Sequence, residues 1–260
     1  MTVMLTANYH THTARCNHAS GTEREYIENA LAAGLTTLGF SDHCPQVFPG
    51  DYYSNFRMRP EQVEDYVTTL LALREEYRGK IDIKIGYEVE YYPALFADFL
   101  ALVSRYPCDY IIMGQHFIEN EMTGKYSGSN TSDPAHLRQY VDQVCEGMRT
   151  GKFTYIAHPD LVPFPGPDDI YRAEYSRLIR CAMDEGVLLE INCLGIRDHR
   201  FYPQQKFWQL AGELGANVVI GCDAHSPDVA ADLASVAVAE DMIQKYGLHR
   251  VEPQLRRISE

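Results

Sequence analysis

The chain has 260 residues and a formal net charge of −13, with 36 acidic residues against 23 lysines and arginines, and 45% of it is hydrophobic. That composition is typical of an ordinary folded protein, and its acidic balance disfavours nucleic acid and anionic membranes as partners. The length favours one large α/β domain, and we expect residues 1–260 to form a single unit.

Cysteine usage and the first residues bear on the compartment. The seven cysteines include no Cys-x-x-Cys pair, which favours free thiols in a reducing compartment. The start of the chain lacks the basic and apolar regions of a signal peptide, and no run approaches the roughly 18 apolar residues of a membrane span. We therefore expect a cytoplasmic protein, and the sequence does not predict its oligomeric state.

Short β-rich runs alternate with longer helical patterns along the whole chain. Strands are predicted over residues 6–10, 36–42, 83–90, 110–117, 153–159, 187–193 and 217–225, and helices over 21–34, 59–77, 93–105, 133–150, 169–185, 203–214 and 227–245. This alternation predicts a parallel sheet covered by helices. A closed seven-stranded (β/α)7 barrel of the TIM type is favoured, because several strands end in polar residues and barrel enzymes carry their sites at these ends.

The first predicted strand ends with a pair of histidines. His10 and His12 are two residues apart, so in an extended chain both side chains point the same way and suit one metal ion. Two surface histidines at a strand end are the alternative. Six of the seven strands carry His, Asp or Glu at or just after this end, which buried structural histidines do not explain. Beyond the first strand these residues are Asp42, His43, Glu88, Glu90, His116, His158, Asp223 and His225.

So many ligand-type residues exceed the needs of one tetrahedral ion. Neutral imidazole suits zinc, iron and related ions, and a carboxylate can bridge two of them. The sequence therefore predicts two to three divalent ions per chain, of Zn, Mn or Fe. Such a cluster activates a water and clamps the oxygens of an ester, and its surplus positive charge selects an anionic substrate such as a phosphate ester.

In this order the segments resemble the polymerase and histidinol phosphatase (PHP) family, and within it the histidinol-phosphate phosphatases. The segments are "HTHTARCNH", "GFSDH", "GYEVEY", "IIMGQHFI", "AHPDL", "LEINCLGIR" and "GCDAHSP". The resemblance covers about residues 7–226. It implies a distorted seven-stranded barrel with the active site at the C-terminal strand ends, which agrees with the seven predicted strands.

The family pattern also implies a trinuclear site. It assigns His10, His12, Glu88 and Asp223 to a first ion, a bridging Glu88 with His116 and His158 to a second, and His18, His43 and His225 to a third. The expected catalytic residues are Asp223, His225 and Glu88. The expected reaction is an in-line attack on phosphorus by a metal-bridging hydroxide, which Asp223 would orient or from which it would accept a proton. Asp42, Glu90 and Asp160 are expected to be packing residues or outer partners of the ligands.

Substrate contacts are predicted from the segment "NCLGIR". It resembles the family segment whose arginine grips the substrate phosphate, here Arg197, whose planar fork of donors matches phosphate geometry. A surface salt bridge is the alternative for this arginine. His199 is expected to touch the substrate. A second phosphate-binding arginine usually follows "HPDL" in these phosphatases, but residues 158–169 contain no basic residue. Arg57, Arg59 and Lys125 are the candidates to substitute for it.

The sequence thus predicts a hydrolase, a phosphoric monoesterase of a small phosphorylated metabolite. L-histidinol phosphate, a substrate of histidine biosynthesis, is favoured, and a nucleotide or sugar phosphate is the alternative. A non-catalytic PHP-like module is a third reading, against which the complete ligand set counts. A carbon–nitrogen hydrolase of the amidohydrolase type usually needs a metal-bridging lysine at a mid-barrel strand end, and no predicted strand ends in one.

Overall fold

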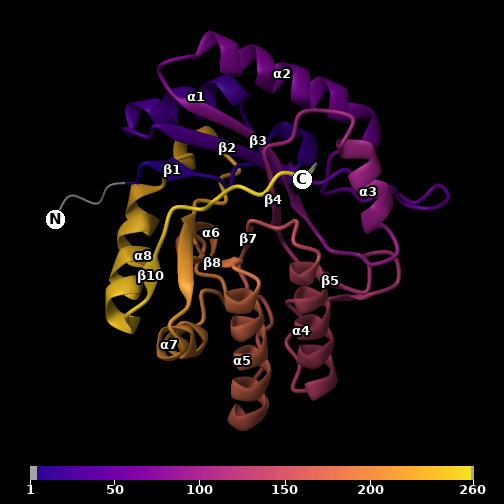
Figure 1. The fold of residues 1–260 in the computed structure, drawn as a ribbon, viewed down its shortest axis with the longest axis vertical. Coiled ribbons are helices and arrows are strands. Elements are labelled where there is room, and N and C mark those ends of the chain that lie inside the picture. The colour runs from indigo at the N-terminus through magenta and orange to yellow at the C-terminus, as the bar shows by residue number, and fades with distance from the viewer. Residues whose placement is uncertain (1–4, 259–260) are drawn as a thin grey trace.

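The computed structural model describes residues 5–258, which form a curled parallel sheet with helices outside it (Figure 1). The main elements are β1 (Ala7–Asn8), α1 (Glu23–Ala32), β2 (Thr37–His43), α2 (Val63–Glu76), β3 (Asp82–Val89), α3 (Phe96–Val103), β4 (Tyr110–Met113), α4 (Pro134–Arg149), β7 (Tyr155–Ile156), α5 (Asp168–Asp184), β8 (Leu188–Asn192), α7 (Gln205–Leu214), β9 (Asn217–Gly221), α8 (Leu233–Tyr246) and β10 (His249–Arg250).

The sheet has eight strands in the order β1-β2-β3-β4-β7-β8-β9-β10, all paired in parallel. All seven predicted strands are present, and the prediction omitted β10, a two-residue strand with no β-rich pattern to announce it. Beyond β9 the chain also returns to the first strand, where Thr11 bridges Ala224 and His12 N donates to Ala224 O at 2.9 Å. The sheet is therefore a strongly curled half-barrel whose ends approach each other beside the histidine pair.

The predicted helices correspond to α1, α2, α3, α4, α5, α7 and α8, and their ends carry the expected signals. Thr22 and Glu25 form a capping box at the start of α1, and Gly215 and Gly247 end α7 and α8 in the left-handed conformation. The pattern did not predict the short helix α6 (Cys193–Arg197) or the hairpin of β5 (Phe117–Ile118) and β6 (Lys125–Tyr126). These unpredicted elements lie in loops that follow β8 and β4.

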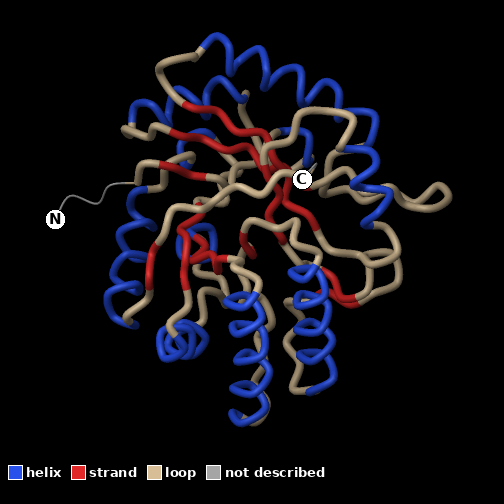
Figure 2. Tube along the Cα trace, in the orientation of Figure 1, coloured by secondary structure: helices blue, strands red, loops and turns tan. Residues whose placement is uncertain are grey.

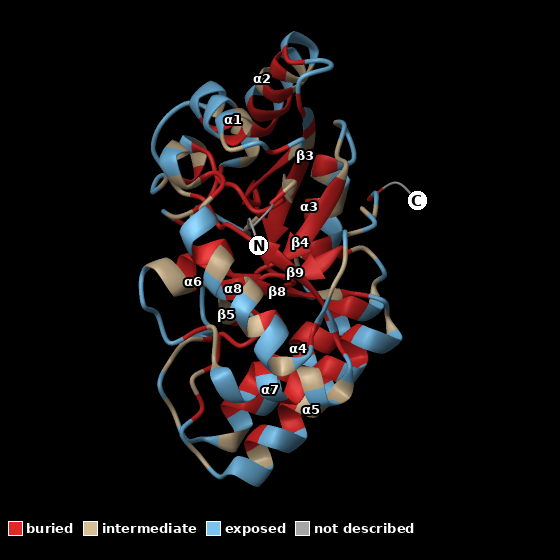
Figure 3. Ribbon diagram, turned by 90° about the vertical axis from the view of Figure 1, so that its left-hand side faces the viewer, coloured by how far each residue is buried: buried red, intermediate tan, exposed pale blue. Residues whose placement is uncertain are grey.

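Packing separates the two faces of the sheet. Figure 2 shows the strands gathered centrally with helices around them, and Figure 3 shows that the strands are buried while the outer helix faces are exposed. Along β3, Tyr87 and Val89 pack into the large core beneath the helices. The intervening Glu88 points to the other face, as the alternation of side chains along a strand requires. Glu88 therefore lies on the concave face of the sheet, whereas its neighbours Tyr87 and Val89 lie in the apolar core on the other face.

None of the helices in the described part of the chain is long and apolar enough to cross a membrane.

Candidate metal centre

A cavity of about 440 Å³ opens where the carboxyl ends of the strands converge. We call its titratable strand-end side the inner wall, made of His18, His43, Glu88, His116, Asp223 and His225. We call its other side the rim, made of Phe56, Phe117, Tyr126, Leu194, Asp198, Arg200 and Tyr202. The inner wall consists entirely of residues that the sequence predicted as metal ligands. His10, His12 and His158, the remaining predicted ligands, lie buried behind it.

Glu88 stands between two sets of imidazoles. Its Oε2 atom lies 3.7 Å from His10 Nε2 and 3.6 Å from His12 Nε2. Its Oε1 atom lies 3.1 Å from His158 Nε2 and 4.0 Å from His116 Nε2. Oε2 also lies 3.0 Å from His43 Nδ1. The two carboxylate oxygens therefore face different sets of ring nitrogens, which is the arrangement that a carboxylate shared by two ions requires.

The first set has donor spacings that suit a small divalent ion. Asp223 Oδ1 lies 3.5 Å from His10 Nε2 and 3.2 Å from His12 Nε2. Ligand atoms bound at 2.0–2.1 Å around a tetrahedral zinc are about 3.3 Å apart. All three of these buried atoms lack a hydrogen-bond partner among residues 5–258, which is costly unless something else satisfies them. The residues present therefore fit a metal ion.

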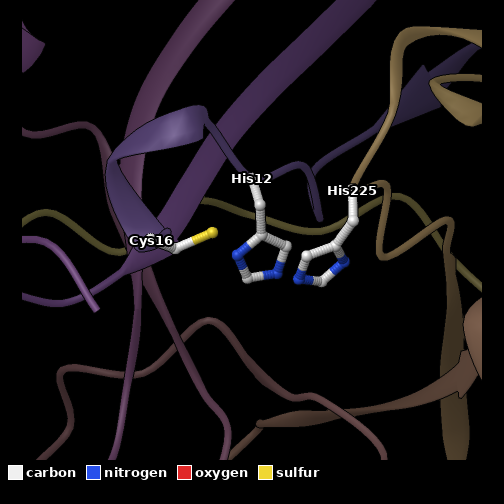
Figure 4. Close-up of side chains that lie close together, drawn as sticks. All are labelled: His12, Cys16 and His225. Atoms are coloured by element: carbon white, nitrogen blue, oxygen red, sulfur yellow. The ribbon is translucent and has the colours of Figure 1, made fainter. Parts of the chain in front are cut away.

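A third set gathers around His43. Donor atoms of His18, His43 and His225 lie within 4.8 Å of one another, and the Nε2 atoms of His18 and His225 are 3.0 Å apart. Cys16 Sγ is also near His12 and His225, but Figure 4 shows it on the opposite side of the His12 ring from His225. We therefore leave Cys16 out of the ligand sets.

Outer partners fix the orientation of several rings. His10 Nδ1 is 2.7 Å from Glu190 Oε1, His116 Nδ1 is 2.8 Å from Glu90 Oε1, and His18 Nδ1 is 2.8 Å from Cys16 O. In each case the contact occupies Nδ1 and leaves Nε2 for a ligand role, as outer partners do in known metal sites. Asp160 does not take this role, because its carboxylate accepts from the backbone N–H of Gln204.

Two glycines make room for the buried carboxylates. A side chain at Gly114 would collide with the carboxylate of Glu88, and one at Gly221 would collide with that of Glu190. Neither glycine has a positive φ, so close approach explains both. The glycines before His116 and Asp223 are therefore part of the site.

The backbone is also shaped for this cluster. His158 and Asp223 adopt φ values of 34° and 47°, a left-handed conformation that costs free energy for such residues and concentrates at functional sites. Buried Asn8 accepts from the backbone N–H groups of His10 and Cys222, each at 3.1 Å. One side chain thus joins the histidine pair to the segment that carries Asp223.

Charges divide the histidines into two groups. Burial would lower the pKa of His10 and His12, but Asp223 and the other carboxylates raise both well above the ordinary value. His116 is raised in the same way, against burial, by Glu88 and Glu90. Three others are lowered mainly by burial: His18, His43, and His225, whose pKa falls to about 3. Burial opposes ionisation of Glu88 and Asp223, yet neighbouring histidines hold both pKa values well below normal.

The structure does not bring the predicted substrate contacts into the cavity. Arg197 Nη1 instead donates to Asp232 Oδ2 at 2.8 Å, and His199 is exposed, with neither residue among those that line the cavity. The phosphate-binding role of Arg197 stays a prediction, and substitution of this arginine tests it. Arg200, three residues later, is the arginine at the rim, where it donates to Tyr202 Oη at 3.1 Å and pairs with Asp198 at 3.3 Å.

The three substitutes considered for the missing arginine lie elsewhere too. Arg57 is completely buried behind the cavity, Arg59 is exposed above the Tyr53 ring, and Lys125 is exposed on β6. None of them lines the cavity among the described residues.

Sequence reasoning missed several residues of the site. Glu190 and Asn8 carried a signal, since each is a polar residue inside an otherwise apolar or β-rich run. The aromatic rim and Arg200 carried none, because a lone aromatic or basic residue in a loop or at a short strand does not reveal what its side chain lines.

Comparison with known proteins agrees with this geometry. A family model described as the PHP domain matches residues 8–194. A probable histidinol-phosphatase of Deinococcus radiodurans is 31% identical over 229 residues, which cover 84% of this chain and 85% of that protein. One of Schizosaccharomyces pombe is 27% identical over 244 residues, or 84% and 80% of the two chains.

Among solved structures, the histidinol phosphate phosphatase of Lactococcus lactis, complexed with zinc, L-histidinol and phosphate, has a TM-score of 0.73. The alignment covers 96% of this chain and 97% of that one at 21% identity. At this identity the likeness is one of fold.

Proposed function

The chain belongs to the PHP domain family, and we propose that it is a metal-dependent phosphoric monoesterase that hydrolyses L-histidinol phosphate to L-histidinol and phosphate. The observation that carries the proposal is the position of Glu88, with one oxygen toward His10 and His12 and the other toward His116 and His158. The name of the D. radiodurans relative supports the substrate. The reaction would belong to histidine biosynthesis.

The proposed centre holds two to three divalent ions, of zinc, manganese or iron. The three ligand sets are His10, His12, Glu88 and Asp223; Glu88, His116 and His158; and His18, His43 and His225. Ions held there would make water a nucleophile at neutral pH and neutralise charge on the phosphoryl oxygens. Orphaned donor atoms and matched spacings support the first set most directly, and the zinc of the L. lactis structure makes that metal a candidate.

Asp223 is the proposed general base. Its Oδ1 atom faces both His10 and His12, while Oδ2 accepts from Asn192 Nδ2 at 3.0 Å. Burial opposes ionisation of Asp223, but the neighbouring histidines lower its pKa, and bound divalent ions would favour the same ionised form. A group that takes a proton from the attacking water must be ionised. The same residue can return that proton to the departing alkoxide. His225 stands beside it, with Nδ1 3.3 Å from Asp223 Oδ1, at the cavity surface.

The rim is the proposed binding surface for the substrate. Arg200 is the cation that lines the cavity among the described residues, and we assign it the contact to the phosphoryl oxygens that the sequence assigned to Arg197. The guanidinium is half exposed and can turn from Asp198. The rim aromatics Phe56, Phe117 and Tyr126 form an apolar wall for an imidazole ring.

We further propose that residues 1–260 work as one phosphoesterase domain. The first seven strands of the main sheet, which leave out the β5–β6 hairpin, would form the family's distorted barrel, and β10 would be an eighth strand added to it. The Thr11–Ala224 bridge supports this, since it joins the segments just beyond the first and last of those seven strands at the site.

A phosphate-release assay over a panel of small phosphates tests the proposal. Metal-loaded protein should hydrolyse L-histidinol phosphate with a kcat/KM at least about tenfold above sugar and nucleotide phosphates, which is roughly 1.4 kcal/mol of transition-state binding. Chelation should remove the activity, and two to three ions per chain should be found by elemental analysis. Another phosphate preferred by tenfold would refute the substrate, and no phosphate release from any would refute the reaction.

A further inference from the structure

We propose that Arg57 is a positioning residue, whose buried guanidinium fixes the ring of His116 through Glu90 and ties two loops of the rim to the metal centre. The inference rests on the proposed function in one respect, namely that His116 is a metal ligand.

Arg57 is unusual because a full charge lies where water does not reach. Its side chain is 0% exposed, and its guanidinium contacts the ring of Phe56 at 4.5 Å from the centroid. A charge removed from water is costly unless it is paired and hydrogen-bonded. Nη2 pairs with Glu90 Oε2 at 2.7 Å and closely with Glu121, and Nη1 donates to Cys44 O at 3.2 Å.

The link to the metal centre runs through Glu90. One oxygen of this carboxylate pairs with Arg57, and the other lies 2.8 Å from His116 Nδ1. Glu90 therefore links the guanidinium of Arg57 to the ring of His116. With Nδ1 held, His116 Nε2 is turned toward Glu88 Oε1. Arg57 is thus the third member of a chain that ends on a proposed ligand, and such outer partners set the orientation of ligand rings.

The same guanidinium joins two loops. Arg57 lies in the segment between β2 and α2, which places Phe56 on the rim, and Glu121 lies in the hairpin connection between β5 and β6, which place Phe117 and Tyr126 there. The rings of Phe56 and Phe117 stack with centroids 6.0 Å apart. Tyr92 Oη also donates to Glu121 at 3.2 Å. If either loop moved away, an ion pair of Arg57, with Glu90 or with Glu121, would break, and the orientation of His116 depends on this network.

The geometry predicts different effects for the two ends of the network. Arg57→Met leaves Glu90 and Glu121 as neighbouring buried carboxylates without their cation, so Glu90 no longer holds His116. Glu121→Gln cuts the tie to the β5–β6 hairpin and leaves Arg57, Glu90 and His116 connected. The first substitution should therefore disturb the ion and the substrate, and the second should disturb the substrate alone.

The experiment titrates the chelator-treated full chain with Zn²⁺ by calorimetry and measures kcat and KM on the reloaded protein. Arg57→Met should weaken one class of Zn²⁺ sites by about 10- to 100-fold, the range for outer partners of metal ligands, and leave the others unchanged. Glu121→Gln should raise KM with Zn²⁺ affinity unchanged. Arg57→Lys, which keeps the charge without the fork, should restore part of the affinity.

Arg59→Met is the matched control, because Arg59 is exposed two residues away and its guanidinium lies over Tyr53. It should behave like wild type. Wild-type protein that takes up no Zn²⁺ would refute the proposed function. Wild type that loads normally, beside an Arg57→Met that loads equally well, would refute this inference and leave the proposed function standing. An unchanged KM in Glu121→Gln would refute the loop connection, and it can be measured even if Arg57→Met does not fold.

Discussion

Five of the six residues on the inner wall come from strand ends or from the residues just beyond them, whereas the rim comes from α6, two loops and the β5–β6 hairpin. The side chain of Glu88 on the inner wall is 2% exposed, and that of Arg200 on the rim is 44% exposed. On the inner wall, register and alternation along paired strands fix the direction of each side chain. On the rim, direction depends on how loops pack, so the two regions should respond differently to substitution.

The largest effect is expected at the centre of the inner wall. Glu88→Ala removes the one carboxylate that faces both pairs of imidazoles, so both ion sets lose a shared ligand. We expect loss of bound metal and a fall in kcat/KM of more than about 100-fold, beyond the range for outer partners. Elemental analysis and a phosphatase assay check this, with exposed Glu64→Ala as the control. Full activity in Glu88→Ala would mean that the inner wall is not the metal centre.

A residue behind the inner wall should matter nearly as much. Glu190 contacts His10 Nδ1 and accepts from the backbone N–H of His158 and from Asn192 Nδ2. Glu190→Gln keeps the shape and removes the charge, so metal affinity should fall by about 10- to 100-fold. Zn²⁺ titration measures it. Wild-type affinity would show that packing alone orients His10.

The rim should give smaller losses, and two arginines sharpen the comparison. Arg200→Ala removes a half-exposed cationic contact of about 1–2 kcal/mol, or roughly 5- to 30-fold in kcat/KM. Arg197→Ala should cost less, up to about 1 kcal/mol, because its guanidinium pairs with Asp232. Bound metal should stay unchanged in both. If Arg197→Ala lost more kcat/KM than Arg200→Ala, Arg197 would be the phosphate-binding arginine, as the sequence predicted.

The smallest expected effect is the release of protons when metal binds, and it distinguishes two groups of histidines in the cluster. The raised pKa values of His10, His12 and His116 favour their protonated forms, and an ion must displace any proton that these rings carry. The lowered pKa values of His18, His43 and His225 leave those rings already neutral.

Metal affinity should therefore increase as pH rises above about 6.5, the ordinary histidine pKa. Calorimetry in buffers of different ionisation enthalpy should show a net release of protons when the metal binds, of up to about three per chain, one for each histidine with a raised pKa. No release, and no dependence on pH, would contradict the division.

The contrast between the inner wall and the rim also explains which features of this protein could be predicted from its sequence. The seven main strands, their helical cover and eight of the nine proposed ligands were predictable, because apolar runs of strand length end repeatedly in His, Asp or Glu. The ninth, His18, lies outside the strand ends and was assigned through the family resemblance. The eighth strand was not, since His249 and Arg250 form a two-residue pair without any β-rich pattern. The Glu190 carboxylate escaped notice because a single charge in the strand "LLEIN" does not reveal what it contacts.

The sequence by itself determined the chemistry of the inner wall, because parallel strands bring their carboxyl ends together wherever the sheet forms. Only the tertiary structure decided that Arg200 and not Arg197 lines the cavity, and that Arg57 is buried in a network with Glu90 and Glu121. The physical reason is that a loop side chain has no fixed direction of its own. Segments far away in the sequence set that direction when they pack against it, as Glu121 does for Arg57 from 64 residues away.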